Sequence, residues 1–150
     1  MTSAFARPVA LIVGSVLLVS ACGGGAVRRD PAVPPSLTIE RFLRAANEND
    51  LDTMISLFGT REGSVRGEWG KEEADRRMFL LANVLRHTDY TVGPEQIVPG
   101  RRDEAAQFTV RLVTQRDGTL QVPMTLVWSR DGQWLIENIP VDRITRPGGV

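Results

Sequence analysis

The chain has 150 residues, of which 42% are hydrophobic and 24% charged, and its 18 basic residues balance 18 acidic residues. This zero net charge argues against a nucleic-acid-binding protein, because such proteins carry a basic surface. One histidine and one cysteine do not supply the ligands of a typical zinc site, so we expect no metal and no other cofactor.

The N-terminal residues have the pattern of a bacterial lipoprotein signal. Arg7 precedes an apolar run over residues 9–19, which is too short to span a membrane but suits a signal peptide. The small residues between this run and Cys22, the only cysteine, resemble the lipobox of bacterial prolipoproteins. That resemblance implies removal of residues 1–21 and attachment of diacylglycerol and an acyl chain such as palmitate to Cys22. The alternative is an ordinary secretory signal or a poor transmembrane helix.

Lipidation would hold the mature chain on a membrane, because two or three acyl chains attach a protein almost permanently. Residues 22–35 combine glycines with a proline-rich stretch that has too little apolar content to fold, so they predict a flexible tether. Gly23 follows the cysteine, in place of the aspartate associated with inner-membrane retention in many Gram-negative lipoproteins. We therefore expect an exported cell-envelope protein. It would lie on the periplasmic face of the outer membrane in a Gram-negative organism, and otherwise on the outer face of the plasma membrane.

One folded domain is expected over residues 36–146, followed by a short tail over residues 147–150. Its first half repeats apolar residues at helical spacing, which predicts three amphipathic helices. They cover residues 39–46, residues 51–58 after a capping Asp50, and residues 71–86. The buried stripe of the third helix should consist of Ala74, Met78, Leu81 and Leu85.

A glycine-rich segment over residues 59–70 separates the second and third helices. It has neither a helical nor an alternating period, so it predicts a mobile loop. Trp69 in this loop is a candidate lid or contact residue, and Arg61 and Arg66 are candidates to orient an anionic ligand.

Beyond His87 the apolar residues alternate, which predicts about four antiparallel strands. The first, over residues 88–98, is interrupted by Gly93 and Pro94. Asp-Gly turns at residues 117–118 and 131–132 join the last three strands.

Alternation assigns each strand residue to one of two faces of the sheet. The concave face should be apolar, with Thr114 and Asn138 as its polar members. Pro123 lacks an N–H group and predicts a bulge or an edge in its strand. The outer face should carry an apolar patch suited to a homodimer, formed by Val113, Val127, Leu135 and Ile139.

Three helices followed by a curved antiparallel sheet resemble the nuclear transport factor 2-like family, which includes SnoaL, ketosteroid isomerase and scytalone dehydratase. The resemblance rests on residues 42–46 (Phe-Leu-Arg-Ala-Ala), 49–52 (Asn-Asp-Leu-Asp) and 131–136 (Asp-Gly-Gln-Trp-Leu-Ile). It covers residues 36–144 and implies an α+β cone, in which the helices pack into the curved sheet and leave a pocket at the open end. Members of one fold differ in function, so the resemblance leaves the activity open.

The candidate ligand-binding residues are the aromatic side chains and the one amide expected near such a pocket. They are Trp69, Tyr90, Trp128, Trp134 and Asn138. Core packing is the expected role of Trp128 and Trp134. No catalytic residue is assigned, because the concave face offers no carboxylate.

These patterns predict a non-catalytic, lipid-anchored envelope protein that binds a small apolar ligand in the cone or a protein partner on the convex sheet. The alternative is an isomerase-like or dehydratase-like enzyme that uses His87, Asp89 or Tyr90 as a base or an oxyanion donor. Alternation separates Tyr90 from the other two, and His87 is expected to bond carbonyls at a helix end. A further alternative is a structural envelope protein whose cone is filled.

Overall fold

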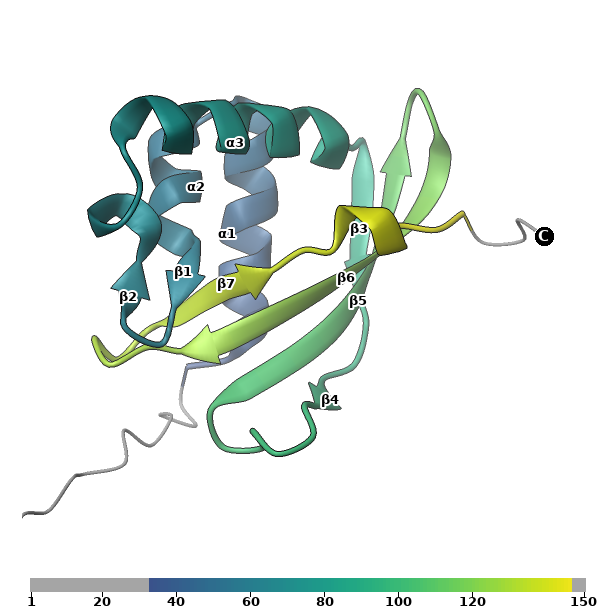
Figure 1. The fold of residues 1–150 in the computed structure, drawn as a ribbon. Helices are drawn as coiled ribbons and strands as arrows, with labels where there is room; N and C mark the ends of the chain where they lie inside the picture. The colour runs from purple at the N-terminus through teal and green to yellow at the C-terminus, as the bar shows by residue number, and fades with distance from the viewer. Residues whose placement is uncertain (1–32, 147–150) are drawn as a thin grey trace, which may run out of the picture.

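The computed structural model describes residues 33–146, and the predicted signal peptide, Cys22 and the tail over residues 147–150 lie outside this range. Three helices cover one face of a curved antiparallel sheet (Figure 1). They are α1 (Pro35–Glu48), α2 (Leu51–Leu57) and α3 (Lys71–Leu85), and they confirm the three predicted helices. Within residues 33–146, no helix is long and apolar enough to cross a membrane.

The main sheet has the strand order β3-β5-β6-β7, and a short β4 also pairs with β5. Its strands are β3 (Asp89–Val92), β4 (Gln96–Ile97), β5 (Ala105–Thr114), β6 (Gly118–Trp128) and β7 (Trp134–Asn138), and the 3-10 helix η2 (Val141–Arg143) follows. The strand predicted over residues 88–98 is therefore two strands. Gly93 still donates to the carbonyl of Thr109 (3.0 Å), but the register then shifts by one residue before Gln96 pairs with Gln107.

The space between the helices and the sheet is filled. The large apolar side chains on the concave face of β5 and β6 are at most 8% exposed, as the alternation predicts; they are Phe108, Val110, Leu112, Leu120, Val122, Met124, Leu126 and Trp128. The helices cover them with Ile39, Phe42, Leu43, Met54, Met78 and Leu85. A side chain that bordered a void large enough for water would have accessible surface, and most of these have none. These side chains occupy the part of the cone in which a small apolar ligand was predicted.

A β-bulge reverses the predicted faces at the end of β7. Leu126 of β6 pairs with Ile136 of β7, but the preceding residue, Thr125, pairs with Asn138. Glu137 therefore lies between the two partners as an extra residue without a partner in β6. An extra residue moves every later side chain to the opposite face. Asn138, predicted on the concave face, is therefore exposed opposite Thr125, whereas Ile139, predicted outside, packs in the core.

Pro123 lies beside a local edge of the sheet, as predicted. Gln121, two residues earlier, directs its N–H away from β5 to the carbonyl of Thr145 (2.7 Å). The nitrogen of Pro123 points to the same side of β6. On that side Gln121 pairs with Thr145 and Thr125 pairs with Asn138, and Pro123 lies between these two pairs. A missing N–H costs no ladder hydrogen bond at that position.

The apolar patch predicted on the outer face is not exposed. Val127 and Leu135 have no accessible surface, Ile139 lies in the core, and Val113 is half-buried. Leu135 lies against the segment after α2, since a Cβ built on Gly59 would stand 2.8 Å from its Cδ1 atom. The predicted homodimer through this face therefore loses the feature that suggested it.

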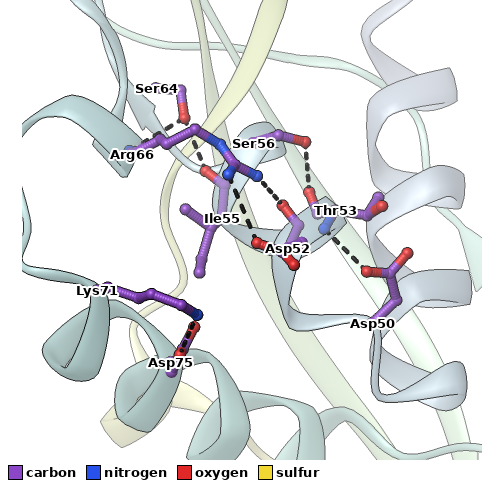
Figure 2. A network of polar contacts seen from close by, with 9 residues as sticks. All are labelled: Asp50, Asp52, Thr53, Ile55, Ser56, Ser64, Arg66, Lys71 and Asp75. Carbon is purple, nitrogen blue, oxygen red and sulfur yellow. Dashed lines mark hydrogen bonds and ion pairs between the residues drawn. The ribbon is translucent and has the colours of Figure 1, made fainter.

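The segment predicted as a mobile loop instead forms a small sheet and a 3-10 helix. They are β1 (Gly59–Thr60), β2 (Gly63–Ser64) and η1 (Val65–Gly67). Figure 2 shows how side chains fix them to α2: Ser64 donates to the carbonyl of Ile55 (2.8 Å), and Arg66 donates to that of Asp52 (2.9 Å). These non-local contacts supply the order that the local sequence pattern lacks.

Asp50 caps α2, as predicted, by accepting a hydrogen bond from the backbone N–H of Thr53 at 3.1 Å (Figure 2). The bond from Thr53 favours the charged carboxylate and lowers the pKa of Asp50 from its usual 3.8. This contribution to stability is present above the unfolded-state pKa and is lost as pH falls through the lower folded-state pKa.

Replacing Asp50 with alanine is therefore expected to lower the melting temperature near pH 7 and to lower it less near about pH 3. Thermal denaturation at both pH values checks this. The Asp50→Asn variant is the control, because asparagine keeps a capping oxygen but does not titrate. An equal loss for Asp50→Ala at both pH values would contradict the assignment.

Candidate functional site

A groove of about 540 Å³ opens where the end of α3 meets the turn between β5 and β6. Its walls are Asn47 at the end of α1, most of residues 83–88, and residues 114–117 of the turn. In Figure 1 this turn rises beside the end of α3. The volume lies within the range of small-molecule sites, but the lining is mainly amide, hydroxyl and charged side chains.

Asn47 and His87, which both line the groove, make a reciprocal contact. The Oδ1 atom of Asn47 accepts from the N–H of His87 (3.0 Å), and its Nδ2 atom donates to the carbonyl of His87 (3.0 Å). These bonds join the end of α1 to the segment that follows α3, forty residues later in the chain.

The ring of His87 is held on both sides. Its Nδ1 atom lies 2.8 Å from the carbonyl of Leu85, which only accepts, so Nδ1 carries the proton. Its Nε2 atom then accepts from Asn47 at 3.3 Å. The predicted contact with helix-terminal carbonyls is confirmed, and both ring nitrogens have protein partners.

Tyr90 lies against this histidine, contrary to the prediction from alternation. The two rings meet edge to face, with centroids 5.3 Å apart and planes at 87°. The prediction was wrong because His87 precedes β3, so the alternation of that strand does not fix its direction. Asp89 is exposed at the first position of β3. His87 and Tyr90 therefore form a packed pair, with Asp89 outside it.

None of the five predicted ligand-binding residues lines the groove. Trp128 and Trp134 stack edge to face in the core with centroids 5.4 Å apart, as expected. Trp69 is half-buried against the ring of Phe58, so it packs on the core edge. Tyr90 lies beside His87, and Asn138 is exposed on the outer face of the sheet. The structure does not bring the five together.

The charges of the groove are mainly positive. Asp117 accepts from Arg116 (3.3 Å) and from Arg146 (2.9 Å), so its carboxylate is shared by two cations. Arg86 is exposed and makes no ion pair with any other residue of the described range. An anionic group would therefore meet a favourable potential between Arg86 and Arg116.

Sequence reasoning missed these groove residues because no local pattern marks them. Asn47 is an exposed residue near the end of α1, Arg86 follows α3, and Arg116 lies in the turn between β5 and β6. The pairing of β3 with β5 brings them together, since Thr88 donates to the carbonyl of Val113 (2.7 Å).

The Asn47→Ala substitution is expected to lower the free energy of unfolding by about 2 kcal/mol, because it leaves the backbone N–H and carbonyl of His87 without partners. Urea denaturation measures the change. Asn83→Ala is the matched control, since Asn83 lines the same groove but bonds only to the carbonyl of Phe79 in its own helix. Equal losses in the two variants would show that the reciprocal contact contributes nothing.

No family model matches this chain, and no curated protein matches it. Among solved structures, a Campylobacter jejuni protein provisionally described as an NTF2-like transpeptidase aligns with a TM-score of 0.51 and 13% identity, over 71% of this chain and 99% of that one. A chain named as a variant of Rd1NTF2_05 aligns with a TM-score of 0.44 and 22% identity, over 69% and 92%. The first likeness shows the fold alone: this chain has the nuclear transport factor 2-like (NTF2-like) α+β cone fold, as predicted.

Proposed function

Proceeding from the NTF2-like fold, we propose that this chain is a lipid-anchored cell-envelope protein that binds a ligand or a protein partner without catalysing a reaction. The observation that carries the proposal is an open, polar, mainly positive groove beside a filled cone. Ligands of this protein then bind at the end of α3 and not between the helices and the sheet. The polar lining favours a polar or anionic group over the apolar ligand first expected.

The arrangement of titratable groups supports binding over isomerase-like or dehydratase-like catalysis. Such a reaction needs a general base that faces the substrate. Both ring nitrogens of His87 are engaged with protein atoms, and Asp89 is exposed away from the His87–Tyr90 pair. A structural envelope protein is the second candidate, and the filled cone favours it. The groove distinguishes the two, because a purely structural protein has no use for a groove arginine, Arg86, that forms no ion pair within residues 33–146.

Transpeptidase chemistry, suggested by the description of the Campylobacter protein, receives no support from the side chains of residues 33–146. A serine nucleophile needs an adjacent base. The only lysine, Lys71, pairs with Asp75 one turn along α3 (2.8 Å), and the hydroxyls of Ser56 and Ser64 donate to backbone carbonyls. The only cysteine is Cys22, which the proposal assigns to lipidation.

The lipid anchor is tested by intact mass spectrometry of the protein purified from membranes, with Cys22→Ser as the control. The wild-type chain is expected to begin at Cys22 and to carry the added mass of diacylglycerol and an acyl chain. The variant is expected to lack that mass and to leave the detergent phase on phase separation. A wild-type chain that still begins at Met1 without added mass would refute lipidation.

A further inference from the structure

The C-terminal half of α3 is apolar on all sides, although the domain covers only one of them. Residues 78–85 contain a single polar residue, Asn83. Phe79, Leu80 and Val84 are 49%, 61% and 36% exposed, while the opposite side of the helix is buried. Helices that are apolar all round are normally covered all round. These three residues, here called the α3 face, form an apolar surface that a partner can cover.

This apolar surface continues into the positive groove. Val84 belongs both to the α3 face and to the groove lining, and Arg86 follows it by two residues. Arg116 lies on the opposite wall, in the turn between β5 and β6. The only carboxylate of the lining, Asp117, is already shared by two arginines. The combined surface thus offers an apolar contact next to an excess of positive charge, because Arg86 and Arg116 outnumber Asp117 in the lining.

We infer that the α3 face and the groove together dock an acidic polypeptide segment of a protein partner. Apolar side chains of the segment would cover Leu80 and its neighbours, and a carboxylate close by in its sequence would meet Arg86 and Arg116. Charge complementarity and desolvated apolar contacts are the usual sources of specificity and affinity in such interfaces. This inference rests on the proposed binding function and names the class of partner.

A second copy of this chain fits the surface less well. A two-fold axis through the α3 face would run the two α3 helices antiparallel. Arg86 of one copy would then approach the exposed Arg76 of the other, since these residues flank the apolar stretch on its two sides. Like charges opposed across an interface disfavour it.

A lipid surface also fits less well, because α1 separates the groove from Val33, where the described part of the chain begins. The chain enters the domain at Val33, whose carbonyl accepts from the Nε1 atom of Trp134 (3.0 Å). It then follows α1, which is 14 residues or about 20 Å long, to Asn47 in the groove. The tether proposed for residues 22–35 would join the domain at the Val33 end of α1, opposite the groove.

Fluorescence anisotropy of a short labelled peptide that alternates leucine and glutamate tests the inference, with the full chain held in phosphatidylcholine nanodiscs. We expect saturable binding, weakened about tenfold or more by Leu80→Ser and by Arg86→Glu. A matched peptide with lysine in place of glutamate should bind about tenfold more weakly. The control variant is Ile97→Ser, since Ile97 is 62% exposed on β4, outside this surface.

Three results would overturn the inference: equal binding of the basic peptide, no effect of Leu80→Ser, or Leu80-dependent binding to phosphatidylglycerol vesicles in place of the peptide. Leu80 and Arg86 are exposed, so their substitution leaves the core intact. A failed anchor would appear separately, as a chain that does not enter the nanodiscs. Peptide binding by that chain would then be measured without nanodiscs, so the two failures are distinguishable.

Discussion

Replacing Trp134 with alanine is expected to lower the free energy of unfolding by about 3–5 kcal/mol. The side chain is 2% exposed and stacks on Trp128, so its removal leaves a cavity. The same residue also holds the start of the domain. Its indole N–H donates to Val33, and its carbonyl accepts from the hydroxyl of Thr38 on α1 (3.2 Å).

Urea denaturation of the wild type and the variant measures this loss. Ile97→Ala is the control for removing a large apolar side chain, because Ile97 is exposed, and it should change stability by less than about 0.5 kcal/mol. A loss of under about 1 kcal/mol for Trp134→Ala would mean that the indole borders open space. In that case the cone would be a ligand pocket, as the sequence first suggested.

Replacing Gly59 with alanine is expected to cost about 3 kcal/mol, which is near the upper end of the usual range for overpacking. The added Cβ would stand 2.2 Å from the carbonyl oxygen of Gly63 and 2.8 Å from the Cα atom of Ser64. Both are backbone atoms of the small β1–β2 sheet, so they cannot move aside as a flexible side chain would. The sheet must open or separate from β7.

Gly67→Ala is the matched control, because a Cβ at Gly67 meets no atom within 4 Å. It should leave stability within about 0.5 kcal/mol of the wild type or raise it slightly, by restricting the unfolded chain. Thermal or urea denaturation compares the two variants. Equal stability of Gly59→Ala and Gly67→Ala would show that the segment over residues 59–70 is not ordered against the domain.

The elements that sequence periodicity predicts are those whose burial is decided locally. Phe42 and Leu43 mark the buried side of α1, and the alternation from Phe108 to Leu112 marks the concave side of β5. In each case, side chains a few residues apart in one helix or strand are buried on the same side of that element. The NTF2-like fold could therefore be predicted from the order of such elements.

The features that sequence reasoning missed depend on pairing between distant segments. Glu137 becomes a bulge only because β6 and β7 pair in a particular register, and this reversed the predicted faces of Asn138 and Ile139. The groove depends on the contact between Asn47 and His87, which are forty residues apart. The periodicity of one segment does not indicate which distant segment will pair with it.

The central claim is that binding occurs at the groove beside a filled cone. NMR spectra of the isotopically labelled full chain, recorded with a set of small carboxylates, amides and aromatic compounds, test it most directly. The account predicts shifts of the backbone amide signals of His87, Thr114 and Gln115, with the indole signals of Trp128 and Trp134 unchanged. Shifts of the two indole signals without any at the groove would contradict it, because they would place the binding site inside the cone.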